Sequence, residues 1–173
     1  MKKWTIDPTH SEVGFKVKHM MFTNVKGLFN DYSADIDFND DLKEANLQFE
    51  AKINSIFTNN TDRDNHLKSA DFFDAEQHPT LNFKSTKIEG NGSEYEITGD
   101  LTIKGITKPV TLNAEFSGLM TDPWGNTKVG LNLDGKINRK DFGLTYNAAL
   151  ETGGVLVGED VKLNAEIQLV EQK

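Results

Sequence analysis

Apolar side chains recur at every second position along most of this chain, which is the period of a β-strand with one buried face. The clearest run alternates with polar residues and consists of Ala45, Leu47, Phe49, Ala51 and Ile53. Comparable runs cover 13–19, 25–38, 79–88, 95–104, 110–117, 129–137 and 161–169. Together they predict about eight strands, several of them longer than the ~5–6 residues of an average strand.

Short turn signals separate these runs. Asn39-Asp40-Asp41 is a turn sequence, and Asn91-Gly92 is the strongest short hairpin signal known. Long strands joined by short turns favour an all-β, antiparallel fold, either a closed barrel or a large sandwich. No repeat or linker divides the chain, so we expect residues 1–173 to form a single domain.

One segment, 58–74, breaks the alternation. Thr61 is a good N-cap residue with Asp64 three positions later, and Leu67 and Ala70 share one helical face. The pattern predicts a short helix over about 62–69. Because a helix of about two turns is unstable alone in water, we expect it to dock on the end of the β-structure.

The charge balance narrows the choice of partners. With 19 basic and 27 acidic residues the net charge is −8, and no basic block is present. Nucleic acid and anionic membrane surfaces are therefore poor candidate partners. The absence of Cys excludes disulfides and thiolate metal sites, and no run is long and apolar enough for an integral membrane span. The N-terminal residues lack the apolar core of a signal peptide, so the cytoplasm is the expected compartment.

Candidate catalytic chemistry is sparse. None of the histidines at 10, 19, 66 and 78 has a metal-ligand spacing such as His-x-x-x-His. No nucleophile elbow or glycine-rich phosphate loop is present. We therefore predict no catalytic residue, no metal site and no cofactor, with His66 as the strongest exception.

Two basic residues allow two interpretations each. Arg63, with His66 beside it, could hold a phosphate or a quinone oxygen at a cavity mouth, or Arg63 could pair with a neighbouring Asp and attach the helix. Arg139 and Asp141 could likewise contact a ligand or form a docking pair for the irregular loop around them. Alternation leaves a further choice open, because it does not distinguish a filled barrel from a hollow one.

Five spaced motifs together resemble a known family. They are Trp4-x-Ile-Asp-Pro-x-His-Ser11, Phe15-x-Val-x-His19, the 58–74 stretch with Arg63-Asp-x-His-Leu67 and Asp71-Phe-Phe-Asp74, Gly99-x-Leu-Thr-Ile-Lys-Gly-x-Thr-Lys-Pro-Val110, and Arg139-x-Asp-Phe-Gly143. This set is similar to the YceI-like family. The resemblance implies a lipocalin-like barrel with a long hydrophobic cavity that binds a polyisoprenoid lipid, such as a polyprenyl phosphate or an isoprenoid quinone, and often a homodimer. Many relatives are periplasmic.

A hollow barrel turns the inward apolar positions into ligand contacts. The expected ligand-binding residues are Phe15, Val17, Leu47, Phe49, Ile53, Arg63, His66, Phe83, Ile97, Leu101, Leu112, Phe116, Leu131 and Phe142. Burying one five-carbon isoprene unit is worth about 4 kcal/mol gross, so roughly five units reach the ceiling of non-covalent affinity. Affinity is therefore expected to rise with chain length and then level off.

The expected role is that of a carrier or storage protein. Two alternatives remain from other classes. One is an enzyme acting on an isoprenoid or another small hydrophobic substrate, with His66 or His19 as the acid–base group. The other is a protein-binding module whose barrel is filled.

Overall fold

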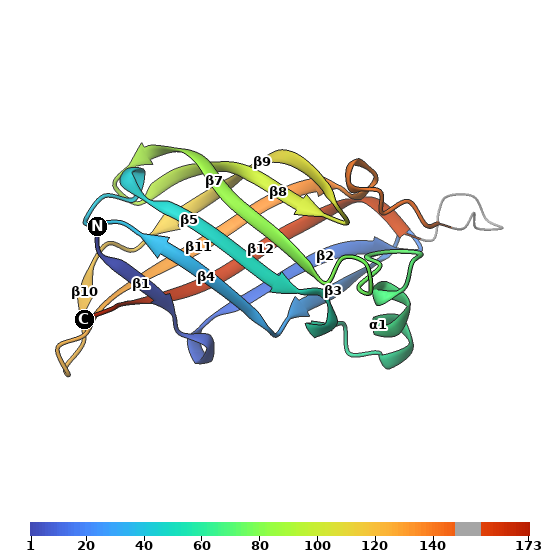
Figure 1. Cartoon of the computed structure of the whole chain (residues 1–173), viewed down its shortest axis with the longest axis horizontal. Coiled ribbons are helices and arrows are strands. Elements are labelled where there is room, and N and C mark those ends of the chain that lie inside the picture. Colours follow the sequence, from blue (N-terminus) through green and yellow to red (C-terminus); the bar gives the residue numbers. More distant parts are fainter. Residues whose placement is uncertain (148–156) are drawn as a thin grey trace.

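Antiparallel pairing runs all the way round a closed barrel in the computed structural model, which describes residues 1–147 and 157–173 (Figure 1). Three of its strands are bent and divide into two segments each. These are β1 (Lys3–Ile6) with β2 (Glu12–His19), β3 (Thr23–Phe29) with β4 (Tyr32–Asp37), and β5 (Asn46–Lys52) with β6 (Ile56–Phe57). The expected run over 25–38 is therefore a strand with a corner in it.

The remaining strands complete the barrel. They are β7 (Thr80–Asn91), β8 (Glu94–Ile103), β9 (Ile106–Phe116), the short β10 (Met120–Thr121), β11 (Thr127–Asn138) and β12 (Val157–Glu171). β12 pairs with β11 along one edge and with β1 and β2 along the other, which closes the sheet. The prediction of an all-β antiparallel barrel of about eight strands is confirmed.

Short 3₁₀ turns lie at two of the bends, η1 (Pro8–His10) and η3 (Ile53–Ser55), and in two connections between strands, η2 (Leu42–Glu44) and η4 (Arg139–Phe142). Periodicity did not indicate any of them, because three or four residues are too few to show a helical pattern.

The expected inserted helix is present as α1 (Thr61–Lys68), at one end of the barrel (Figure 1). Its cap differs from the prediction. Asn60, and not Thr61, is the N-cap residue, and its side-chain oxygen accepts a hydrogen bond from the backbone N–H of Arg63 at 3.0 Å. Asp64 does not form the predicted capping box; its carboxylate accepts hydrogen bonds from Thr58.

The core consists of two hydrophobic clusters. The first lies at the barrel end that holds both chain termini, where Trp4 stacks on Phe38 with ring centroids 4.7 Å apart and Phe116 meets Phe38 edge to face (Figure 1). The indole N–H of Trp4 donates to the backbone oxygen of Phe38 at 3.0 Å, which satisfies its polar group. The second cluster, around Ile53 and Phe142, lies towards α1.

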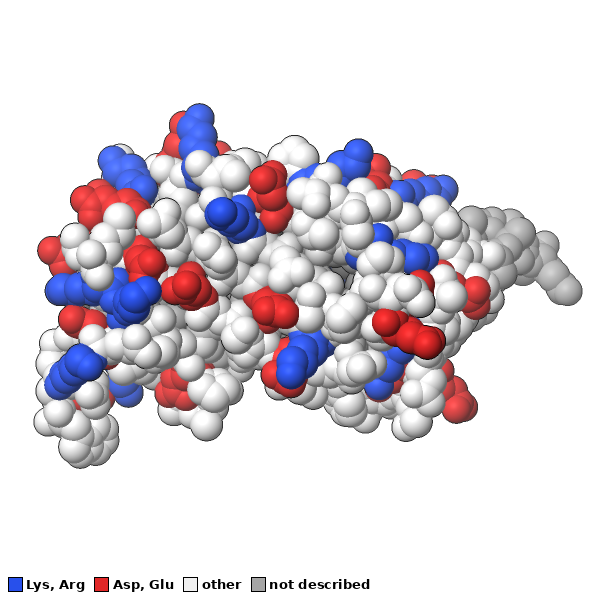
Figure 2. Space-filling view, viewed as in Figure 1, with Lys and Arg blue, Asp and Glu red and all other residues white. Residues whose placement is uncertain are grey.

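The outer face carries the polar half of the alternation. Basic and acidic side chains are interspersed over the face in Figure 2, and the ion pairs of the described residues are mostly exposed ones such as Lys87 with Glu89. Exposed pairs contribute little to stability, so the barrel depends on its interior.

The corner between β1 and β2 is organised by Asp7. Its carboxylate accepts hydrogen bonds from the backbone N–H and the hydroxyl of Thr9 at 3.0 and 2.7 Å and lies 2.9 Å from Nδ1 of His10. The Thr9 hydroxyl first, and then His10, lower the pKa of Asp7 from 3.8 to about 2.

We predict that Asp7→Asn lowers the melting temperature at pH 7 but not at pH 2. A carboxyl group whose folded pKa is depressed stabilises the fold above its ordinary pKa of 3.8, and this contribution is lost as the pH falls towards 2. Thermal denaturation followed by circular dichroism from pH 2 to pH 7 measures the difference. The exposed Asp100→Asn is the control and is expected to match the parent protein at each pH. An Asp7→Asn deficit of the same size at both ends of the range would contradict the assignment.

Candidate ligand-binding cavity

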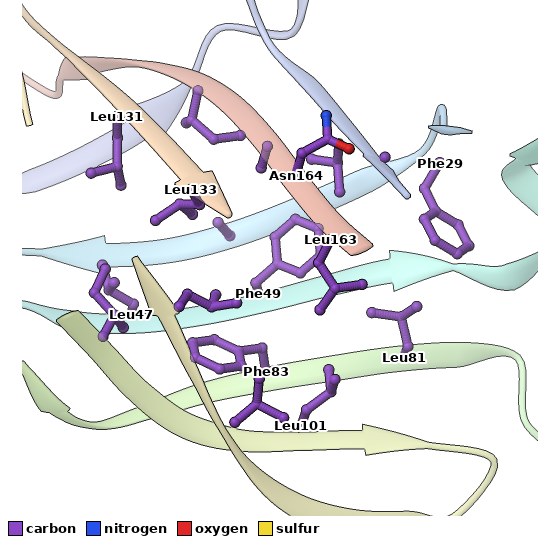
Figure 3. A pocket seen from close by; sticks show the side chains of 18 of the residues that line it. Phe29, Leu47, Phe49, Leu81, Phe83, Leu101, Leu131, Leu133, Leu163 and Asn164 are labelled. Atoms are coloured by element: carbon purple, nitrogen blue, oxygen red, sulfur yellow. The ribbon is translucent and has the colours of Figure 1, made fainter. Parts of the chain in front are cut away.

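An apolar cavity of about 160 Å³ lies inside the barrel. The strands all round it send side chains into the same space, as Figure 3 shows for Leu47, Phe49, Phe83, Leu133 and others. It is lined by Ile6, Val13, Gly14, Phe15, Phe29, Ala34, Ile36, Leu47, Gln48, Phe49, Leu81, Phe83, Ile97, Leu101, Ile103, Val110, Leu112, Leu131, Leu133, Leu163, Asn164, Ala165 and Ile167. Gln48 and Asn164 are the polar side chains in this set, so the wall offers a ligand almost nothing but hydrocarbon.

Eight residues of the predicted ligand-binding set line this cavity. They are Phe15, Leu47, Phe49, Phe83, Ile97, Leu101, Leu112 and Leu131. They come from strands on all sides of the barrel, and the alternation placed each of them on the inner face. Contact of these residues with a ligand stays a prediction.

The other six predicted residues lie elsewhere. Phe116 belongs to the cluster at the terminal end, and Ile53 and Phe142 belong to the cluster towards α1. Val17 is half-buried on β2, while Arg63 and His66 lie on α1. Alternation predicts which face a side chain is on but not its depth along the barrel axis, which is why inward residues near the two ends were grouped with the cavity wall.

Several lining residues were missed by the sequence analysis. Leu81, Leu133 and Leu163 occupy inward positions of predicted strands, so the same alternation could have identified them. Phe29 could not be found in this way, because the corner between β3 and β4 puts it out of phase with Ala34 and Ile36. Leu133 and Leu163 lie on β11 and β12, whose long pairing forms the closing seam.

Three inward-facing glycines make room for bulky lining side chains. A methyl group at Gly27 would come within 2.2 Å of the Phe15 ring, and one at Gly99 within 2.5 Å of the Phe83 ring. At Gly135 a methyl group would come within 2.5 Å of Leu112. Because these side chains lie against bare backbone, they are drawn back towards the wall and leave the centre of the barrel less filled.

The helix α1 is attached through Thr58. The Asp64 carboxylate accepts hydrogen bonds from the backbone N–H and the hydroxyl of Thr58 at 2.8 and 2.5 Å. Arg63 donates from Nε to the Thr58 hydroxyl and from Nη2 to the Thr58 carbonyl, at 2.8 and 2.6 Å. Arg63 thus attaches the helix, as one of the two sequence interpretations expected, but its partner is Thr58 and not an Asp, and the contact is a pair of hydrogen bonds and not an ion pair.

His66 lies in an aromatic setting outside the cavity wall. Its Nε2 is 2.9 Å from the Asp71 carboxylate, and its ring meets those of Phe72 and Tyr146 edge to face at 5.0 and 4.8 Å. These contacts hold the turn after α1 against the segment that follows η4.

The turn after α1 also reaches the cavity. The Phe73 ring lies edge to face with Phe29, at 6.3 Å, and Phe29 is itself a lining residue. At the opposite end Trp4 and Phe38 are almost fully buried and tightly stacked. Both ends are therefore closed by packed side chains: the terminal end by the Trp4 and Phe38 stack, and the α1 end by the second cluster, against which Phe73 packs.

Arg139 is buried and bonded to backbone oxygens. It donates to the carbonyls of Leu144, Tyr146, Val157 and Gly158. Burial lowers its pKa below the ordinary value. Within the described part of the chain its hydrogen-bond partners do not include Asp141, so of the two sequence interpretations the loop attachment is observed, through carbonyls and not through a carboxylate.

Residues 1–147 and 157–173 contain neither a metal-ion cluster nor a membrane-spanning helix. No group of three or more His, Cys, Asp or Glu side chains there is arranged to hold a metal ion. No helix in the same ranges has the length and hydropathy needed to cross a bilayer.

We predict that Gly27→Ala weakens the binding of an apolar probe. The three atoms nearest to the added methyl group all belong to the Phe15 ring, which is therefore displaced towards the lumen. A several-fold loss of affinity for a fluorescent hydrophobic dye, measured by titration, is expected. Gly130→Ala is the control, since a methyl group there meets Ser117 no closer than 3.5 Å. Adding Phe15→Leu to Gly27→Ala should restore binding. Equal dye affinity in the Gly27 and Gly130 variants would refute the role given to the glycine.

Comparison with known proteins places the chain among relatives of its own length. A UPF0312 protein of Staphylococcus epidermidis is 40% identical over 172 residues, 97% of each chain, and one from Staphylococcus aureus is equally similar. The crystal structure of a Campylobacter jejuni YCEI protein is 40% identical, with a TM-score of 0.79 over 96% of each chain.

More distant structures share the fold. A polyisoprenoid binding domain from Saccharophagus degradans, implicated in plant cell wall breakdown, aligns over 98% of each chain with a TM-score of 0.69 at 12% identity. Burkholderia cenocepacia BcnA aligns over 94% of this chain and 98% of its own with a TM-score of 0.80 at 22% identity. The family model of the YceI-like domain matches residues 4–169. The chain belongs to the YceI-like family.

Proposed function

We propose that this protein binds a long-chain isoprenoid lipid, a polyprenyl phosphate or an isoprenoid quinone, inside the barrel and acts as its carrier or store. The observation that supports this most is a cavity whose wall is almost entirely hydrocarbon and is contributed by strands all round the barrel. Such a wall favours a chain without polar groups. Membership of the YceI-like family adds support, as does the shared fold with a polyisoprenoid binding domain.

The present cavity suits only a short part of such a chain. At about 160 Å³ it is close to the ~150 Å³ engineered cavity that admits one benzene molecule. A longer ligand therefore needs the lumen to widen. We propose that the side chains of Phe15, Phe49 and Phe83 rotate to widen it. They are only half-buried and border the cavity, so their rotation costs less free energy than moving a fully buried core side chain.

The proposed entrance is at the α1 end. There the Phe73 ring, in the turn after α1, lies directly against the cavity-lining residue Phe29. The polar head of the lipid would stay outside, near Arg63 and His66, where their present partners Thr58 and Asp71 would compete with it. The homodimer expected from the family resemblance also stays a prediction.

No observation favours the enzyme alternative over binding. His66, its strongest candidate, is engaged by Asp71 and two aromatic rings and is not among the lining residues. His19 is at the end of β2, next to the hairpin turn.

Native mass spectrometry of the purified protein tests the proposal. We expect a co-purifying lipid, or uptake of an added prenyl lipid, with a mass that identifies the isoprenoid. Leu133→Trp, which fills the lumen, should reduce occupancy at least tenfold, whereas Leu119→Trp, at an exposed position outside the cavity, should not. Protein that is empty as purified and that takes up no prenyl lipid would exclude the proposed function.

A further inference from the structure

The hairpin that joins β2 to β3 presents an apolar tip to solvent. Met20, Met21 and Phe22 are 43%, 53% and 84% exposed, so three consecutive large apolar side chains stand clear of the barrel. Monomeric proteins seldom display contiguous apolar groups in this way unless the patch meets a partner.

The backbone of this tip is strained at Met20 and Met21. Met20 and Met21 have φ angles of +53° and +65°, and the Phe22 N–H donates to the His19 carbonyl at 3.3 Å. Positive φ at both central residues is the requirement of a type I′ turn, in which Asn-Gly is the favoured pair. Two methionines in this conformation carry a steric cost that Asn-Gly would avoid. The turn therefore keeps two exposed methionines at positions where Asn-Gly would be more stable.

The strands behind the tip are basic. Residues 13–30 contain Lys16, Lys18 and Lys26 but no Asp or Glu, in a chain with 27 acidic residues. Strand register extends this charge into a row of four lysines on the outer face, because Lys26 pairs with Lys16, Lys16 with Lys162, and Lys162 with Lys136.

Like charges placed directly opposite one another on neighbouring strands repel. Among the described residues, the row has one ion pair, between Lys136 and Asp160 at 3.8 Å. The ammonium groups of Lys16, Lys26 and Lys162 therefore form an anion-attracting surface, next to the paired Lys136. The net charge of −8 gave no sign of this basic row, because the lysines come together only through the strand register.

We propose that the β2–β3 hairpin docks the protein onto an anionic phospholipid bilayer, with Met20, Met21 and Phe22 in the interface and the lysines over the lipid phosphates. Lys18 is two residues from the tip, about 7 Å along the strand, and Lys16 is about 13 Å away. The polar interface of a bilayer is roughly 5–8 Å deep on each side. Apolar groups followed by lysines at this spacing are typical of interfacial anchors.

This inference rests on the proposed function for its purpose and deepens it. An isoprenoid lipid resides in the bilayer, and the hairpin lies at the same end of the barrel as α1, where the entrance is proposed (Figure 1). Acidic residues on and after α1, Asp62 and Asp71, would be repelled by an anionic surface. The hairpin side of that end would therefore face the membrane.

A second exposed apolar turn supplies a matched control. Trp124 is 81% exposed in the turn between β10 and β11, at the opposite end of the barrel (Figure 1). At this turn the Asp122 carboxylate lies 3.3 Å from Lys128, and Lys173 donates to the Gly125 carbonyl at 3.0 Å. Its apolar exposure thus resembles that of Phe22, but it has no row of lysines behind it.

Vesicle co-sedimentation at low and high salt tests the proposal. The parent protein should bind phosphatidylcholine vesicles that contain phosphatidylglycerol and bind at least tenfold less to phosphatidylcholine alone or in high salt. Phe22→Ser, and separately Lys16→Glu with Lys26→Glu, should each reduce binding to the anionic vesicles about tenfold. Trp124→Ser should bind like the parent protein. Circular dichroism confirms that each variant is folded.

Two results would overturn the docking surface. One is a binding pattern that does not follow the hairpin: the Phe22 and lysine variants bind anionic vesicles as well as the parent protein does, or only Trp124→Ser loses binding. The other is a change of oligomeric state in Phe22→Ser, by sedimentation velocity, with unchanged vesicle binding, which would assign the tip to a second copy of the chain. Uptake of a prenyl lipid from detergent, measured on the same variants, separates failure of docking from failure of the cavity.

Discussion

The closing seam between β11 and β12 is the constraint on which the rest of the structure depends. Pairing from Lys128 with Val170 to Asn138 with Asp160 joins the last strands of the chain, and β12 then pairs with β1 and β2. A shift of one residue in this register would turn the inward residues of one of the two strands outwards, either Leu131 and Leu133 on β11 or Leu163 on β12. The register of this seam places apolar residues inside, around the cavity, and brings Lys136 and Lys162 together outside; the pairing of β12 with β2 and of β2 with β3 completes the lysine row.

Closure also explains how a chain with only 36% hydrophobic residues keeps an apolar interior. Each strand needs one apolar face, and all those faces meet around one axis. Tight packing is concentrated at the two ends, in the Trp4 and Phe38 stack and around Ile53 and Phe142. Between them, Gly27, Gly99 and Gly135 hold bulky side chains against the wall. The middle of the barrel is therefore the place where a ligand can replace missing contacts.

The fold was largely predictable, because period-two alternation is a local signal and Asn91-Gly92 is a specific turn sequence. The bends were not, since η1 depends on Asp7 meeting Thr9, His10 and the distant Gln168. For the site, alternation identified the inner face and hence Phe49, Leu101 and Leu131. Depth along the axis and the lysine row depend on long-range register, which one sequence does not reveal. The Thr58 partner of Arg63 is only five residues away, but it depends on how the chain turns into α1.

The central claim is that the inward apolar positions surround a lumen that a hydrocarbon chain can fill. The most direct test is the dissociation constant of the protein for a series of prenols of increasing length. Burying each added isoprene unit contributes about 4 kcal/mol of gross binding free energy, and the cost of ordering the chain reduces this contribution. The account predicts that affinity rises with each unit and levels off once the lumen is full. Affinity that is independent of chain length from the shortest prenol onwards would contradict it.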